Sequence, residues 1–245
     1  ESLPCLVEDF VYDNINLESG NQMVSAGLNN LFGEVIWFYP ESNSSVVNRM
    51  VAYNYFDSST RRPVWTVGSL ARTMWRDSAV FGKPHALEYD ASTDTSFDVV
   101  GNTEGRTSYY EHETGTDQNR NGTITAITAN ISSGDFDITQ RIARGATTGT
   151  ADLRGDGEFL MKIRRFVPDF ISQTGATRVT LELRNFPNDS QASSALGPFD
   201  VTSSTTKVDT RARARAIALK IENTAASQSW KLGTFRLDIQ PDGRR

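Results

Sequence analysis

GEVIWFYPESNSSVVNRMVAYNYFDSSTRRPVWTVGSL, residues 33–70, contains three short aromatic and β-branched runs separated by polar breaks. The runs are residues 34–40, 49–56 and 63–70. The breaks are rich in Asn, Asp and Ser, whose side chains can hydrogen-bond to their own backbone in turns. The pattern predicts three neighbouring antiparallel strands, a β-meander of the kind that forms propeller blades and other all-β proteins.

The composition sets limits on the class of protein. A length of 245 residues suffices for one large all-β domain, or for two smaller ones, with a core that needs no disulfide. The single Cys5 cannot form an internal bridge and therefore leaves the redox compartment undetermined. The net charge of −5 argues against a general affinity for nucleic acid, but it leaves room for a locally basic surface. No apolar run approaches the roughly 20 residues that cross a bilayer, so we expect no membrane anchor.

The remaining chain also has mainly strand patterns. Residues 1–10 are expected to finish a strand, and residues 11–30 to form an exposed loop rather than a helix. Residues 115–122 are expected to form a polar turn, whereas residues 123–131 fit both helix and strand patterns. Runs of strand-like or period-two character occupy residues 72–80, 83–89, 96–100, 107–113, 158–166, 178–184, 211–221 and 230–239.

A change in composition suggests where the chain divides. Residues 145–157, GATTGTADLRGDG, are so rich in Gly, Thr and Asp that they predict a long surface loop or a junction. We therefore predict a propeller-like β-meander region in residues 1–145 and a C-terminal antiparallel β region in residues 146–245. One continuous domain is the alternative. The predicted fold class is all-β, built from antiparallel meanders.

Two short motifs have a functional and a purely structural interpretation. Asp117, Asn119 and Asn121 followed by Gly122 match the first half of an EF-hand calcium loop, but Thr128 stands where a bidentate carboxylate is required. An Asx/Gly turn is therefore favoured, with at most a weak cation site. The tripeptide at residues 154–156, Arg-Gly-Asp, is a cell-adhesion motif that also arises easily by chance in such a loop.

The titratable residues do not define a catalytic centre. His85 and His112 are interpreted as surface histidines, because the two glutamates beside His112 would point away from it on a strand. Glycoside hydrolysis needs two facing carboxylates, and the sequence cannot select a pair among the acids. The candidate acids are Glu88, Asp90, Glu111 and Glu113. We predict no catalytic residues, no metal site and no cofactor.

An alternating run near the C-terminus predicts a row of cations. In a strand, Arg211, Arg213 and Arg215 would place three guanidinium groups on one face, and the intervening alanines would lie on the other. The row can meet phosphates, acids of a partner subunit or water. A solvated or salt-bridged face is favoured over a nucleic-acid site.

Several longer strings resemble the tail-tube or nozzle proteins of short-tailed bacteriophages. At the start of the chain these strings are MVSAG (23–27), LFG (31–33), EVIWFYP (34–40), VAYNYFD (51–57) and PVWTVGSLARTMW (63–75). Towards the end they are RFVPDF (165–170), GPF (197–199), DTRAR (209–213), IALKIE (217–222), WKLG (230–233), RLD (236–238) and QPDGRR (240–245). The resemblance spans most of the chain, but its strings are structural rather than catalytic.

The resemblance implies an architecture and a role. It implies a virion protein with a β-propeller-like domain and an accompanying β-domain, assembled as a ring, by expectation a hexamer, below the portal and adaptor. Such a ring extends the channel that retains the double-stranded DNA genome and conducts it during ejection, without sequence recognition. The chain is short for a full propeller plus a tube-forming region, so we expect it to be the C-terminal part of a longer polypeptide.

The resemblance also assigns roles to particular residues. It implies that Arg211, Arg213 and Arg215 lie at a subunit or domain contact, where forked donors suit carboxylates. It implies that five aromatic side chains pack between neighbouring blades: Trp37, Tyr39, Tyr53, Tyr55 and Trp65. If the two tryptophans are fully buried, replacing either with Ala should cost about 3–5 kcal/mol.

Two other functions remain as alternatives. A receptor- or glycan-binding tail module would use exposed aromatics such as Tyr109 and Tyr110 for stacking. An enzyme acting on surface polysaccharide ranks third, because nothing in the sequence selects its catalytic carboxylates.

Overall fold

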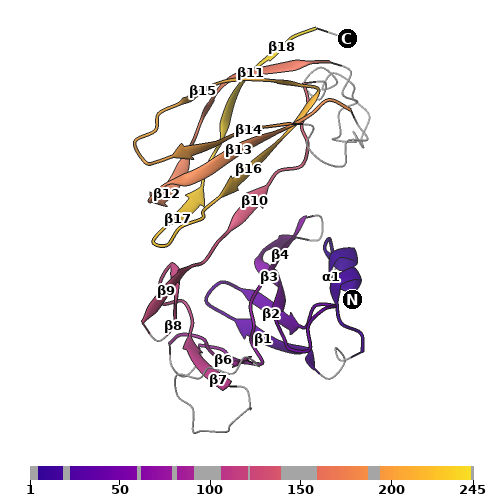
Figure 1. Ribbon diagram of the computed structural model, residues 1–245, viewed down its shortest axis with the longest axis vertical. Coiled ribbons are helices and arrows are strands. Elements are labelled where there is room, and N and C mark those ends of the chain that lie inside the picture. The colour runs from indigo at the N-terminus through magenta and orange to yellow at the C-terminus, as the bar shows by residue number, and fades with distance from the viewer. Residues whose placement is uncertain are drawn as a thin grey trace. The chain divides into compact units, whose positions relative to one another are not determined.

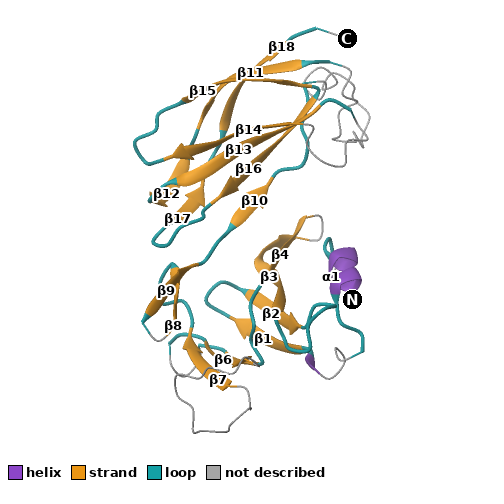
Figure 2. Cartoon of the chain, viewed as in Figure 1, coloured by secondary structure: helices purple, strands orange, loops and turns teal. Residues whose placement is uncertain are grey.

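The computed structural model describes residues 5–18, 23–59, 62–78, 82–90, 106–120, 122–138, 159–186 and 194–243. Nearly all of its regular structure is β-strand, arranged in several antiparallel sheets (Figures 1 and 2), so the prediction of an all-β fold is confirmed. The chain divides into two compact units between Thr114 and Gly115. This division lies earlier in the chain than the predicted one at residues 145–157, which are outside the described residues.

The first unit contains the predicted meander. A four-stranded antiparallel sheet has the strand order β1-β2-β3-β4, in which successive strands are neighbours. Its strands are β1 (Ser25–Asn29), β2 (Glu34–Tyr39), β3 (Arg49–Ser59) and β4 (Arg62–Gly68). The last three strands confirm the three strands predicted from residues 33–70, but β3 continues past residue 56 to Ser59, into the predicted polar break.

A second, three-stranded meander follows in the same unit. Its strands are β5 (Met74–Arg76), β6 (His85–Asp90) and β7 (Arg106–Glu111), again paired in sequence order. The three strands correspond to three of the predicted runs. The run at residues 96–100 lies outside the described residues.

The N-terminal segment differs from its prediction. Residues 8–14 form a helix, α1 (Glu8–Asn14), and not the end of a strand and a loop. Glu8 and Asp9 lie in the first helical turn, where negative charge is favourable. No side chain caps the helix, and Val7 occupies the N-cap position, so the usual sequence signal for a helix start is missing. Strand β1 was likewise unpredicted, because its sequence SAGLN is short and contains Gly27.

The first unit has a small core on one face of its four-stranded sheet. Ile36, Phe38, Val47 and Ala52 are buried, and three partly buried side chains pack against them: Met50, Leu70 and Trp75. The Trp75 ring lies directly on Gly27, where an added Cβ would approach its Cδ1 to 2.3 Å. Gly27 therefore allows β1 to contact the ring.

The second unit encloses a larger core between sheets. One sheet has the order β10-β16-β13-β14, a second has the order β15-β11-β18, and β12 pairs with β17 (Figure 1). The strands of the first sheet are β10 (Asn130–Ser132), β13 (Thr177–Arg184), β14 (Ser194–Val201) and β16 (Ala216–Glu222). The other strands are β11 (Met161–Val167), β12 (Phe170–Thr174), β15 (Val208–Ala214), β17 (Ser229–Leu232) and β18 (Arg236–Pro241).

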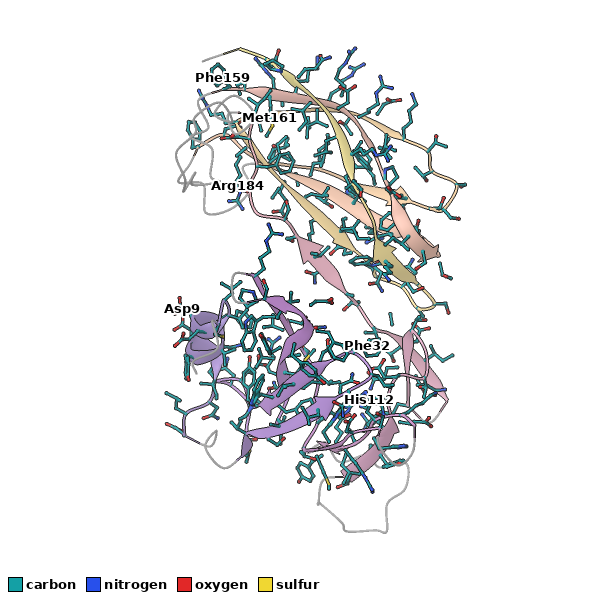
Figure 3. All side chains as sticks on the ribbon, turned by 180° about the vertical axis from the view of Figure 1, so that it is seen from behind. Asp9, Phe32, His112, Phe159, Met161 and Arg184 are labelled. Atoms are coloured by element: carbon teal, nitrogen blue, oxygen red, sulfur yellow. The ribbon has the colours of Figure 1, made fainter. Side chains whose placement is uncertain are left out.

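Alternating strand residues from both sheets fill this core. Phe166, Leu181 and Ile217 have no exposed surface, and they come from β11, β13 and β16. Figure 3 labels Met161, another fully buried residue of β11. Because side chains alternate between the faces of a strand, the period-two runs predicted beyond residue 157 bury one half of their residues.

Several predicted strands are divided in the structure. The run at residues 211–221 forms β15 and β16, which belong to different sheets and are separated by Arg215. The run at residues 230–239 likewise forms β17 and β18, and its break contains Gly233, whose added Cβ would lie 2.8 Å from the Asp169 carbonyl oxygen. Strands β12 and β14 were not predicted.

The start of the second unit shows which structure is formed by residues 117–126, where the sequence predicted a turn followed by either a helix or a strand. Residues 117–120 and 123–126 form a hairpin, β8 (Asp117–Arg120) and β9 (Thr123–Ala126), so the predicted turn is shorter than residues 115–122. The strand alternative therefore holds for residues 123–126. None of the helices in the described ranges is long and apolar enough to cross a membrane.

Candidate functional site

One face of the β2–β3–β4 sheet presents a cluster of aromatic rings. The ring centroids of Trp37 and Trp65 lie 6.0 Å apart, and those of Tyr53 and Trp65 lie 4.9 Å apart. Tyr53 and Trp65 are directly opposite each other on β3 and β4. All three side chains are half-buried, so neither Trp37 nor Trp65 meets the condition of full burial set for a 3–5 kcal/mol loss.

The other two aromatic residues predicted to be structural have different surroundings. Tyr39 is buried, with 2% of its surface exposed, whereas Tyr55 is 38% exposed and packs edge-on against Phe56. The structure therefore brings together three of the five aromatic residues that the sequence singled out. Packing between propeller blades remains a prediction for all five.

Helix α1 lies next to the aromatic face and leaves a cavity beside it. The cavity has a volume of about 330 Å³ and is lined by Cys5, Glu8, Val11, Tyr12, Trp37, Val51 and Trp65. None of the α1 side chains is buried, so the helix covers the sheet only loosely. Tyr12 is 66% exposed. The arrangement offers aromatic rings and one carboxylate to a small ligand.

A second cluster of the first unit is built around a buried arginine. Arg72 is only 4% exposed, and its Nη1 lies 2.9 Å from a carboxylate oxygen of Glu88. Its Nε donates a hydrogen bond of 2.9 Å to Nε2 of His112, and its guanidinium lies 4.1 Å from the centroid of the Tyr110 ring. The buried cation is thus held by an ion pair, a hydrogen bond and a cation–π contact.

His112, labelled in Figure 3, is not the surface histidine that the sequence predicted. It is half-buried, and its ring centroid lies 4.6 Å from that of Trp75. Burial, followed by the charges of Arg72 and His85, lowers the pKa of His112 from 6.5 to about 4. Because Nε2 accepts the hydrogen bond from Arg72, the ring is neutral at pH 7. His85 is also half-buried and stacks on Tyr109, with a ring separation of 5.4 Å.

Acidification should destabilise the first unit through His112. The unfolded chain binds a proton with the ordinary pKa of 6.5, whereas the folded chain binds it only near pH 4. Between these values the unfolded state holds more protons, so stability falls as the pH falls. We expect a loss of about 2 kcal/mol from pH 7 to pH 4, after allowance for partial solvent exposure. Urea denaturation at a series of pH values measures this loss, and His112→Gln should flatten the profile. An equally steep profile for the variant would contradict the assignment.

The acids considered for glycoside hydrolysis have other partners in the structure. Glu88 pairs with Arg72, Glu111 lies 3.6 Å from Lys83, and Glu113 accepts a 3.2 Å hydrogen bond from the Asn29 amide. The side chain of the fourth candidate, Asp90, lies outside the described residues.

Glu34 was not singled out from the sequence, although its environment is unusual. Burial and, to a smaller extent, the neighbouring charge of Glu113 raise the pKa of its carboxyl group. Glu34 and Glu113 lie at the ends of distant segments of the sequence, so no local motif could have shown that they are close. Neither residue lines the cavity beside α1.

The predicted calcium half-motif contributes to local structure. The Asn119 side chain accepts a 2.9 Å hydrogen bond from the Gly122 backbone N–H, and Gly122 has a φ of +86°. The Asp117 carboxylate accepts the backbone N–H of Ser227 at 2.8 and 2.9 Å. The predicted Asx/Gly turn is therefore confirmed. In the described part of the chain, no group of three or more His, Cys, Asp or Glu side chains is arranged to hold a metal ion.

The alternating arginines lie only in part where they were predicted. Arg211 and Arg213 are exposed on β15, while Ala212 and Ala214 on the opposite face are buried in the core. Arg215 follows the end of the strand and is half-buried, so it does not extend the row. Arg213 forms an ion pair with Asp242. The Arg-Gly-Asp tripeptide at residues 154–156 lies outside the described residues.

Comparison of the sequence with known protein families and with curated proteins found no match. The class of protein is therefore defined by the fold: an all-β chain of two compact units, the first made of meanders and the second of packed sheets.

Proposed function

We propose that the chain is a structural component of a phage tail, part of the nozzle below the portal that retains the genome and conducts it during ejection. The phage-tail role is inferred from the resemblance of the sequence to tail-tube and nozzle proteins of short-tailed bacteriophages. The meander topology of β1–β4 and β5–β7 is compatible with propeller blades, in which successive strands are neighbours.

The observation that carries an assembly role is the apolar surface of the first unit. Leu31 and Phe32 follow β1 and are 48% and 51% exposed, and Phe56 on β3 is 66% exposed. The Phe56 ring lies on the backbone of Gly33, where an added Cβ would approach it to 2.3 Å, and it packs against Tyr55 with ring centroids 4.9 Å apart. This apolar patch is of the kind that other chains cover in an assembly.

Unpaired strand edges also favour assembly. The outer strands β1 and β4 of the first sheet, and β15 and β18 of the second unit, each have a neighbouring strand on one side only among the described residues. Open edges invite pairing with other chains unless they are covered. A ring of copies, together with the portal, adaptor and other tail proteins, would cover both the edges and the apolar patch.

The titratable cluster around Arg72 supports a role without catalysis. The guanidinium is shared by Glu88, His112 and the Tyr110 ring, all within the first unit. Glu88 and His112 each bond to the guanidinium of Arg72, which is the arrangement expected of a buried polar network that holds neighbouring strands together.

Imaging of the purified chain tests the proposal. Negative-stain electron microscopy and native mass spectrometry should reveal rings of a defined number of copies, and particles should carry the protein on the tail axis. Monomers at every concentration, or peripheral spikes on particles, would overturn it.

A receptor- or glycan-binding tail module is the second candidate, and the cavity beside α1 favours it. Sugar rings stack on indole faces, and Glu8 and Tyr12 could bind hydroxyl groups there. Titration with host surface oligosaccharides, followed by the tryptophan fluorescence of the chain, tests this candidate. A saturable change that is lost in Trp65→Ala would favour binding over a purely structural role.

A further inference from the structure

The outer face of the β15–β11–β18 sheet is strongly cationic. We define the cationic face as the half-buried Arg165 and the exposed basic side chains of β11, β15 and β18: Lys162, Arg164, Arg211, Arg213 and Arg236. The buried residues of the same strands point into the core on the opposite side. Strand pairing places Lys162 opposite Arg213, so cations of neighbouring strands lie side by side.

The carboxylates of this face are already engaged. Asp238 pairs with Arg165 at 3.3 Å, Asp242 pairs with Arg213, and Asp209 lies 3.2 Å from Lys207. Four cations then remain without a carboxylate partner among the residues described: Lys162, Arg164, Arg211 and Arg236. Like charges that lie close together repel one another unless counter-charges are present. We therefore expect the cationic face to bind an anionic partner.

The excess of acidic side chains that could supply this partner lies in the first unit. Residues 1–114 contain 7 Lys and Arg against 16 Asp and Glu, a net charge of −9. Residues 115–245 contain 18 against 14, a net charge of +4. The overall charge of −5 is therefore the sum of two units of opposite net charge, and oppositely charged surfaces on separate copies would attract each other.

Within the acidic unit, α1 presents two carboxylates that form no ion pair with any residue that the structure describes. Asp9 and Asp13 are spaced i, i+4 and share one face of the helix, and both are exposed. No ion pair holds either of them among the described residues. Asp9 is labelled in Figure 3. Asp13 lies in the last helical turn, which contains no basic residue, so its charge is unfavourable there unless a cation comes from elsewhere.

The same helix offers an apolar contact surface. Glu8 and Tyr12 face the cavity beside the sheet, whereas Phe10 is 47% exposed between the two aspartates along the chain. Carboxylates flanking an aromatic ring match guanidinium groups, which bind carboxylates and stack on rings.

We propose that α1 of one copy docks on the cationic face of a second copy through Asp9 and Asp13. The contact is heterologous, because the two copies contribute different surfaces, and repetition of such a contact closes into a ring or continues as a filament. The inference rests on the self-assembly part of the proposed function, but not on the phage-tail role.

A charge-swap experiment on the full chain tests the contact. Lys162→Glu with Arg211→Glu should raise the dissociation constant of self-association at least about tenfold, as should Asp9→Lys with Asp13→Lys. Combining the four substitutions should restore affinity towards the wild-type value. Raising NaCl from 50 to 500 mM should weaken the wild-type assembly, because exposed charge pairs are screened. Sedimentation velocity over a concentration series provides the measurement.

A matched control separates this contact from a change in net charge. Arg178→Glu with Lys231→Glu changes the net charge equally on exposed residues of other sheets, β13 and β17, and should leave self-association unchanged. Equal weakening by the control, or no restoration in the fourfold variant, would overturn the contact.

Two further outcomes distinguish failure of this contact from failure of the proposed ring. Intact assembly of the Lys162/Arg211 variant would reject this surface while leaving the proposed ring untouched, whereas a monomeric wild-type chain would reject the ring itself. Salt-dependent binding of a double-stranded DNA oligomer that the variant loses, with unchanged self-association, would assign the face to nucleic acid and reject the docking of α1.

Discussion

Replacing Arg72 with Met should lower the free energy of unfolding of the first unit by about 3–5 kcal/mol. The substitution retains much of the apolar stem but removes the charge that neutralises Glu88, whose side chain is only 15% exposed. It also removes the donor to His112 Nε2 and the cation over the Tyr110 ring. A buried carboxylate without a partner is more costly than the net gain from the original pair.

Urea denaturation followed by tryptophan fluorescence measures this effect, because Trp37, Trp65 and Trp75 all lie in the first unit. Arg49→Met in the same unit is the matched control. Arg49 pairs with Glu41 at 2.7 Å, but both side chains are about one-third exposed (31% and 28%), so its loss should cost about 1 kcal/mol or less. Equal losses in the two variants would show that the Arg72 network adds nothing beyond a surface pair.

A double-mutant cycle separates the ion pair from the rest of the network. Removing Glu88 together with Arg72, as Arg72→Met with Glu88→Leu, should cost less than the sum of the two single changes, because no buried charge is left without a partner. An additive result would mean that the two side chains are not coupled. His112→Gln in the same background then reports how much of the remaining loss comes from the hydrogen bond to Nε2.

The meander of the first unit could be predicted because local rules agree there. Strands β2, β3 and β4 are rich in aromatic and β-branched residues, and polar residues with turn-forming side chains mark the end of each of the first two runs. Helix α1 could not be predicted in this way. It is short, it lacks a side-chain cap and it buries none of its side chains, so neither cap nor periodicity marks it.

Interruptions of long strands were missed for a different reason. The residues around Arg215 continue a strand-like pattern without a break, yet β15 and β16 pair with different partners in different sheets. A strand pattern gives the direction in which each side chain points, but it does not say where the chain passes from one sheet to another. Arg211 and Arg213 therefore matched the prediction and Arg215 did not.

The contacts around Arg72 could not be predicted from the sequence, because the residues that make them come from separate elements. Arg72 precedes β5, Glu88 lies on β6 and His112 follows β7, and only the pairing of β5, β6 and β7 brings them together. The cationic face was partly visible in the alternating arginines, but Lys162 and Arg236 join it through strand pairing of β11 with β15 and β18.

Replacing Phe166 with Ala should lower the stability of the second unit by about 3–5 kcal/mol. The side chain has no exposed surface, and its ring centroid lies 5.6 Å from that of Phe199 on β14 and 5.2 Å from that of Phe235 before β18. The ring thus connects the two sheets across the core, and its loss leaves a cavity that neighbouring strands can fill only in part.

Hydrogen exchange measured by mass spectrometry can locate this loss. Peptides from β13 and β16 should lose protection in Phe166→Ala, whereas peptides from β2 and β3 should not, because those strands belong to the other compact unit. Phe186→Ala is the control, since that ring is 69% exposed and its removal should change stability by no more than about 0.5 kcal/mol. Unchanged exchange in β13 and β16 would mean that Phe199 and Phe235 close the gap, and that the two sheets do not depend on the Phe166 ring. Loss of protection in β2 and β3 as well would instead mean that the two compact units unfold together.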